Sequence, residues 1–160
     1  MKAYCKIEDK NINGIITFEQ FIGYSKITFK LSGFNPNKVH GIHIHEFSDL
    51  SNGCLSLGSH YNPYNKQHGN IIIHHNDRHA GDLINNLVTD DGGNFNYSYN
   101  DPLVVVKDII NRSVVIHEGR DDLGLYRNNN KVPVKQREGS STTGNSGGRI
   151  ACGIITEHIE

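Results

Sequence analysis

The chain has 160 residues and a mass of 17.9 kDa, which suits one domain and is too small for two domains with sizeable cores. It carries 16 Lys and Arg against 17 Asp and Glu, without a long run of either sign, which argues against a dedicated nucleic-acid binder. The longest purely aliphatic run covers only residues 103–106, and no apolar core typical of a secretion signal follows Met1. We therefore expect a cytoplasmic protein with no membrane contact.

Short segments in which apolar and polar residues alternate recur along the chain and predict half-buried β-strands. The predicted strands, in chain order, are 14–22, 25–31, 39–47, 83–89, 94–99, 113–117 and 149–156. Between two of them, Asp91-Gly92-Gly93 predicts a hairpin. No window carries an apolar stripe over three helical turns. The pattern therefore predicts an all-β domain, either an antiparallel sandwich or a barrel.

Two long stretches fit no strand. Residues 48–82, the first loop, are rich in Ser, Asn, Gly and His, and residues 119–148, the second loop, are rich in Asn, Gly, Ser and charge. Composition alone is equally compatible with disorder. The histidines of the first loop and the cysteines at the loop edges favour order, because bound metal offsets the entropy of ordering a loop. We therefore expect both loops to be ordered by a site.

Histidine is plentiful, with ten residues. His43 and His45 lie two apart on a predicted strand, so both point to one face and can bind the same metal ion. Further candidate ligands are His60, His68, His79 and Asp82 in the first loop and His117 at the end of a later strand. Imidazole suits both zinc and copper, so the ligand type leaves the metal open.

A series of short motifs links the chain to one known family. In chain order they are 13–20 (NGIITFEQ), 41–47 (GIHIHEF), 53–58 (GCLSLG), 60–63 (HYNP), 68–69 (HG), 78–83 (RHAGDL), 117–124 (HEGRDDLG) and 144–155 (GNSGGRIACGII). Through these motifs the chain resembles the copper/zinc superoxide dismutase family, of the eukaryotic cytosolic type. The resemblance implies a single domain over residues 1–160, folded as an eight-stranded antiparallel Greek-key barrel or sandwich with two long functional loops.

The resemblance also implies a site and a reaction. The copper ligands would be His43, His45, His60 and His117, and the zinc ligands His60, His68, His79 and Asp82, with His60 shared. Asp121 would join His43 to His68 by hydrogen bonds and fix both rings. Arg149 would lie beside the copper and attract an anion. The implied enzyme converts two superoxide anions to dioxygen and hydrogen peroxide, with His60 and Arg149 as its catalytic residues.

The same resemblance implies a disulfide between Cys54 and Cys152. Cys5 would then remain as a free, inward-facing thiol, since three cysteines form at most one bridge. The family also implies a homodimer and is compatible with delivery of copper by a chaperone. At the C-terminus, ITEHIE places Glu157 where the family has an aliphatic dimer contact, which weakens that expectation.

The second loop departs from the family pattern. Thr142 stands at the position of the family's steering lysine, and Gly139 replaces an acidic residue. The loop is also longer, and its cations are Arg127, Lys131, Lys135 and Arg137. We expect electrostatic steering to persist with different residues.

Two other functions compete with an active dismutase. One is a binding module that has kept the fold and lost turnover. The chain retains every expected copper ligand and Arg149, and it has no CxxC or CxC for metal transfer. The other is a zinc-only hydrolase, which requires an open zinc position with a general base. The expected zinc ligands form a closed set of four instead, so the dismutase remains the leading hypothesis.

Overall fold

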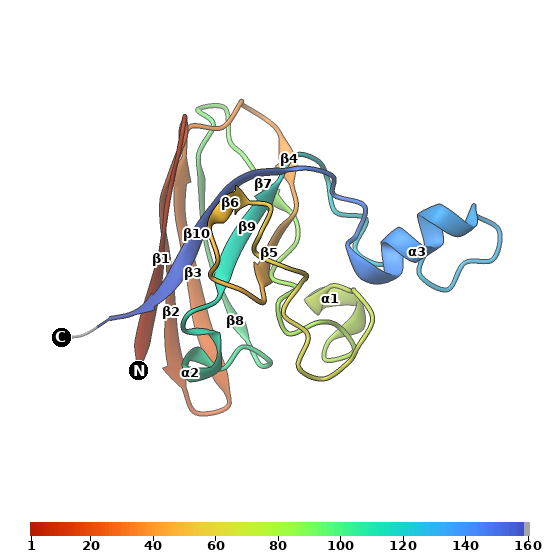
Figure 1. Cartoon of the computed structure of the whole chain (residues 1–160), viewed down its shortest axis with the longest axis horizontal. Helices are drawn as coiled ribbons and strands as arrows, with labels where there is room; N and C mark the ends of the chain where they lie inside the picture. Colours follow the sequence, from red (N-terminus) through yellow and green to blue (C-terminus); the bar gives the residue numbers. More distant parts are fainter. Residues whose placement is uncertain (159–160) are drawn as a thin grey trace.

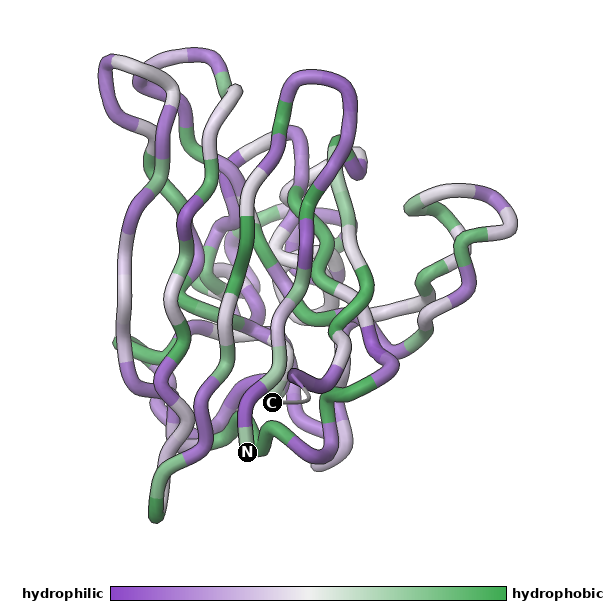
Figure 2. The backbone as a smooth tube through the Cα atoms, turned by 90° about the vertical axis from the view of Figure 1, so that its left-hand side faces the viewer, coloured by the Kyte–Doolittle hydropathy of each residue, from purple (hydrophilic) through white to green (hydrophobic). Residues whose placement is uncertain are grey.

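The first part of the chain, in which apolar and polar residues alternate, forms three long strands. A computed structural model, which describes residues 1–158, has β1 at Lys2–Asp9, β2 at Ile12–Phe21 and β3 at Tyr24–Ser32. In β3, Ile27, Phe29 and Leu31 are buried, whereas Lys26 and Lys30 are exposed. Figure 2 shows this alternation as changes of colour along the strands. One face of each strand thus packs on the core and the other meets water.

Seven strands form one antiparallel sheet in the order β5-β9-β10-β1-β2-β3-β8. The remaining members of this sheet are β5 (Ile42–His45), β8 (Phe95–Asp101), β9 (Ser113–His117) and β10 (Arg149–Glu157). A second ladder pairs β4 (Val39–His40) with β7 (Leu87–Val88), and β6 (Ser51–Cys54) lies in the first loop. The sheet curls into an open barrel, with both termini at one side (Figure 1). The predicted all-β class is confirmed.

Three local expectations need correction. Residues 39–47 divide into β4 and β5, and residues 83–89 contribute only the two residues of β7. The turn at Asp91-Gly92-Gly93 forms, with Gly93 N–H donating to Asp90 O over 3.0 Å. However, β7 before it pairs with β4, and β8 after it pairs with β3, so this turn does not close a hairpin. Pairing partners far away in the chain decide these elements.

The described part of the chain also contains three helices: α1 (Ile71–His74), α2 (Val106–Ile109) and α3 (Val134–Thr142). The second loop carries α3 on a projecting arm (Figure 1). Only Ser140 of this helix is buried, so it has no apolar stripe that a sequence pattern could reveal. No helix within residues 1–158 is both long and apolar enough to span a membrane.

The core lies inside the curl, between the buried faces of the strands. Cys5 is completely buried there and lies outside the disulfide, as expected. Burial raises the pKa of its thiol to about 12. Strands β5 and β9 are buried on both faces, because the core covers one face and the two long loops cover the other.

Candidate metal centre

The site is built on β5, at the edge of the large sheet. Ile42 and Ile44 enter the core, whereas His43 and His45 point to the opposite face. The free edge of β5 is met by the first loop, which forms isolated antiparallel bridges between His43 and Asp82 and between His45 and His60. On the other side of β5, β9 ends at His117, whose backbone pairs with Arg149 of β10. Three strands and one loop therefore converge on one small volume.

A first group of four histidines surrounds this volume: His43, His45, His60 and His117. One nitrogen of each lies within 4.8 Å of the corresponding nitrogens of the others. The four nitrogens, His43 Nδ1 and Nε2 of the other three, are buried and have no hydrogen-bond partner within residues 1–158. Buried polar atoms are rarely left unpaired. Four converging imidazole nitrogens without partners fit a bound metal cation.

Hydrogen bonds at the opposite ring nitrogens explain why those atoms remain free. His45 Nδ1 donates to the carbonyl of Gly58 over 2.9 Å, and His117 Nδ1 donates to that of Gly147 over 3.1 Å. His43 Nε2 donates to Asp121 Oδ2 over 2.5 Å. Since the proton of a neutral imidazole occupies the donor nitrogen, the lone pair lies on the other one. Each ring is thus held in the tautomer that a metal requires.

Burial also keeps these imidazoles uncharged. It is the largest cause that holds the pKa values of His43 and His45 far below their usual value, with a further contribution from the charge of neighbouring histidines. Burial likewise lowers the pKa of His117 and brings that of His60 to about 4. Neutral rings at physiological pH can bind a cation without first losing a proton.

A second group converges on one oxygen of Asp82. Its Oδ1 lies 2.9 Å from His60 Nδ1, 2.9 Å from His68 Nδ1 and 3.3 Å from His79 Nδ1. The other oxygen, Oδ2, accepts the backbone N–H groups of Gly69 and His79 over 2.9 and 3.1 Å. His60 therefore takes part in both groups, one through each ring nitrogen.

The surroundings of His68 point to a cation in this second group. Its Nε2 donates to Asp121 Oδ1 over 2.8 Å, so a neutral ring would turn the lone pair of Nδ1 toward the carboxylate of Asp82. That arrangement is favourable only with a proton or a metal ion between the two atoms. Although burial opposes the charge, Asp82 and Asp121 raise the pKa of His68 to about 10. A metal cation can take the place of that proton.

Asp121 links the two groups, because its oxygens accept from His43 and His68. The sequence did not reveal how Asp121 is itself held. Asn85 donates to Asp121 Oδ2 over 3.1 Å, and the Asn86 amide pairs with both the backbone N–H and the carbonyl of Asp121, at 2.6 and 2.9 Å. These asparagines fall in a segment predicted as a strand, where no pattern marks them as supports of the site.

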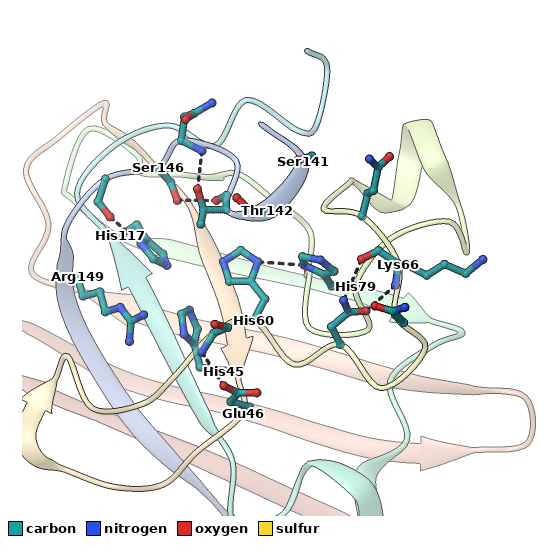
Figure 3. A pocket seen from close by; sticks show the side chains of 17 residues that line it. His45, Glu46, His60, Lys66, His79, His117, Ser141, Thr142, Ser146 and Arg149 are labelled. Atoms are coloured by element: carbon teal, nitrogen blue, oxygen red, sulfur yellow. Dashed lines mark hydrogen bonds between the residues drawn. The ribbon is translucent and has the colours of Figure 1, made fainter. Parts of the chain in front are cut away.

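A cavity of about 930 Å³ opens above the first group and is lined by His45, His60, His117 and Arg149 (Figure 3). Arg149 donates to the carbonyls of Cys54 and Gly58 over 2.8 and 2.6 Å, which fixes its guanidinium at the cavity wall. The cations that line the cavity are Arg149 and Lys66. Arg127, Lys131, Lys135 and Arg137 of the second loop are not among its lining residues within the described part of the chain. The cavity wall thus carries no cation from that loop.

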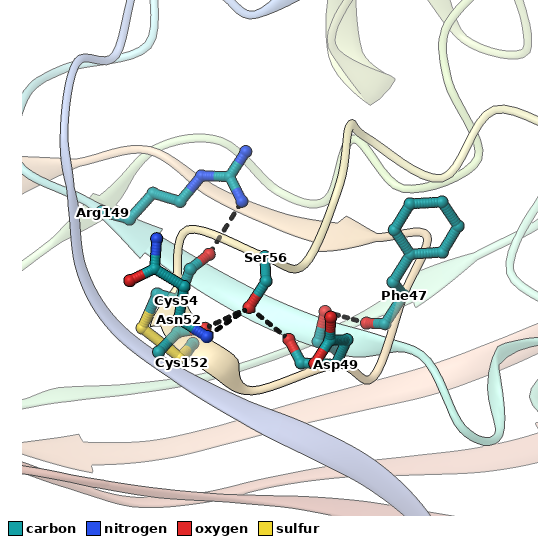
Figure 4. Close-up of a disulfide and its surroundings, with 9 residues drawn as sticks. Phe47, Asp49, Asn52, Cys54, Ser56, Arg149 and Cys152 are labelled. Atoms are coloured by element: carbon teal, nitrogen blue, oxygen red, sulfur yellow. Dashed lines mark hydrogen bonds between the residues drawn. A yellow bond between two sulfur atoms is a disulfide. The ribbon is translucent and has the colours of Figure 1, made fainter.

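The expected disulfide is present. Cys54 and Cys152 are bonded, their Cα atoms lie 5.8 Å apart, and 98 positions separate them in the chain. Figure 4 shows that the carbonyl of Cys54 accepts a hydrogen bond from Arg149. The bridge thus ties the first loop to β10 at the point where the loop holds Arg149.

Comparisons with known proteins agree with this geometry. A family model described as copper/zinc superoxide dismutase (SODC) matches residues 12–155. The superoxide dismutase [Cu-Zn] of Humicola lutea is 42% identical over 152 residues, which cover 92% of each chain. The extracellular superoxide dismutase [Cu-Zn] of Brugia pahangi is 40% identical over 92% of this chain and 71% of the relative. A solved structure of the clock protein EA4 has a TM-score of 0.83 at 37% identity, covering 97% of this chain and 93% of its own. The chain belongs to the copper/zinc superoxide dismutase family, and its two histidine groups fit the two metals of that name.

Proposed function

We propose that the first group binds copper, that the second group binds zinc, and that the protein dismutes superoxide. The copper ligands are His43, His45, His60 and His117, and the zinc ligands are His60, His68, His79 and Asp82. The observation that carries the first assignment is a set of four buried nitrogens that have no partner among residues 1–158. Each is turned inward by a hydrogen bond or an ion pair on its opposite side.

One alternative set of four residues could form the zinc site instead. Ligand atoms of His43, His60, His68 and Asp82 also lie within 4.8 Å of one another, and this alternative set does not include His79. We favour His79, because its Nδ1 lies 3.3 Å from both Asp82 Oδ1 and His60 Nδ1. His43 instead has its Nδ1 among the four inward nitrogens and its Nε2 on Asp121. Three imidazoles and a carboxylate form a closed tetrahedral set suited to zinc.

The chain's residues have distinct tasks in the reaction 2 O₂⁻ + 2 H⁺ → O₂ + H₂O₂. Copper supplies the one-electron redox chemistry, which zinc lacks. Arg149 attracts the anion and orients it at the cavity floor, because its guanidinium is fixed by two carbonyls. His60 lines the cavity and would carry one of the two protons to the peroxide. Asp82 and Asp121 hold the rings in place while protons and electrons move.

Superoxide decay after pulse radiolysis tests this function directly. Protein loaded with copper and zinc should remove superoxide catalytically, and protein loaded with zinc alone should not. Equal decay rates in the two samples would contradict the assignment of the chemistry to a copper site. Bound copper without catalysis would point to a metal-binding module instead.

We also propose that the protein forms a homodimer. Phe47 directly precedes the first loop, and Leu50 and Leu55 lie within it. These three residues, here called the first-loop patch, are exposed to 52%, 49% and 67% on the segment that the disulfide ties to β10. A group of exposed large apolar side chains is typical of an interface. Glu157 is exposed near the end of β10, and residues 159 and 160 of the ITEHIE segment lie outside the described part of the chain. A cytoplasmic location and copper delivery by a chaperone stay predictions.

A further inference from the structure

One cation of the second loop is not at the surface. The side chain of Arg127 is only 8% exposed, and it lies away from the 930 Å³ cavity. Its guanidinium enters the first loop instead, between His68 and Asp77. Burial of a guanidinium costs desolvation free energy, which only well-placed hydrogen bonds and an opposite charge can offset. The partners of Arg127 therefore indicate its role.

Arg127 makes three hydrogen bonds to the first loop. Nη1 donates to the carbonyls of His68 and Asp77 over 3.1 and 3.0 Å, and Nη2 donates to Asp77 Oδ2 over 2.6 Å. The hydrogen bond from Arg127 is the largest cause that lowers the pKa of Asp77. His68 and Asp77 flank the segment that contains α1, so one planar side chain closes this part of the loop.

The backbone of His68 is held at both of its polar groups by the second loop. Its N–H donates to the carbonyl of Ser141 over 2.8 Å, and its carbonyl accepts from Arg127. The second loop also approaches closely at Gly124, where a Cβ atom would lie 2.6 Å from the His68 carbonyl oxygen. The ring is fixed separately by Asp121. Arg127 thus completes a clamp on a residue whose Nδ1 faces Asp82.

We propose that Arg127 is a positioning residue for His68, and that through this clamp the second loop controls how firmly the zinc group holds its metal. This inference rests on the zinc assignment proposed above. Removal of a residue that hydrogen-bonds to a metal ligand typically lowers the metal affinity by about 10- to 100-fold. Loss of the Arg127 contacts should act mainly on the release of metal, because it frees His68 and the α1 segment to move.

The test uses the full chain with zinc, or with cobalt(II) as a spectroscopic substitute, in the second group. Arg127→Gln should release zinc to a chromogenic chelator roughly 10- to 100-fold faster than the wild type, and should alter the visible cobalt bands, which report ligand geometry. Arg127→Lys keeps the charge and one donor group, and should recover part of both properties.

Two matched variants separate positioning from charge. Arg137→Gln removes a cation of the same loop whose side chain contacts Asn130, and should behave like the wild type. Asp77→Asn removes the ion pair but retains the bond from Arg127 to His68, and should keep the cobalt spectrum.

Zinc release and cobalt bands of Arg127→Gln that match those of Arg137→Gln would overturn the proposal. If Arg127→Gln does not fold, wild-type zinc release from Arg127→Lys would overturn it equally. A wild-type protein without tetrahedral cobalt bands would refute the zinc assignment itself, and this inference with it.

Discussion

At the scale of single residues, the direction of each lone pair matters more than the number of histidines. Ten histidines do not make a metal site, because an imidazole that donates from one nitrogen can bind a cation only through the other. Gly58, Gly147 and Asp121 accept hydrogen bonds from those donor nitrogens and turn three rings inward. The protein thus prepares its first group with two backbone carbonyls and one carboxylate.

His117→Ala tests the copper assignment at one ligand. His117 lies in the first group only, so the variant should lose copper affinity by more than about 100-fold and lose copper-dependent turnover, while zinc content stays near that of the wild type. Metal analysis after dialysis, together with superoxide decay, measures both effects. Full turnover with normal copper content would show that His117 is not a ligand. Equal loss of both metals would indicate general disruption.

Arg149→Ile tests the cation at the cavity wall. Removal of this charge should slow the reaction by roughly 10-fold or more at low salt, and should weaken the dependence of the rate on ionic strength. Arg149→Lys keeps the charge but cannot span the carbonyls of Cys54 and Gly58 in the same way, so we expect an intermediate rate with a normal salt dependence. Unchanged kinetics in Arg149→Ile would remove this residue from the reaction.

At the scale of elements, sequence reasoning succeeds where the chain's own periodicity decides the structure. Strands β2 and β3 and the histidine pair of β5 follow from alternation, and the motifs around them resemble one family, whereas β1 is not among the strands predicted from alternation. Sequence reasoning fails to predict α3, a nine-residue helix without an apolar face, and the extent of β7, which depends on pairing with β4. The contacts of Asn86 and Arg127 are also unpredictable, because they join loops that lie far apart in the chain.

The disulfide joins two such distant elements, and its removal gives a prediction about stability. Cys152→Ser opens a loop of 98 positions, which costs roughly 4–5 kcal/mol in the chain-entropy model and should lower the melting temperature by about 10–20 °C. Calorimetry measures the change, and reduced wild-type protein provides the control, since it should melt near the variant. A variant that melts with the oxidised wild type would show that the bridge does not stabilise the fold.

At the scale of the whole molecule, the first-loop patch predicts the state of association. A symmetric dimer buries Leu55 of both subunits, and burial of one leucine contributes about 1.5–3 kcal/mol. Leu55→Asp removes both contributions, so it should weaken the dimer by at least about 100-fold. Ile72→Asp is the matched control, because Ile72 on α1 is 71% exposed and lies outside the patch. Analytical ultracentrifugation over a range of concentrations should find a dimer for the wild type and for Ile72→Asp. It should find a monomer for Leu55→Asp. A wild-type monomer at all concentrations would refute the dimer, whereas a dimer that survives Leu55→Asp would move its interface to another face.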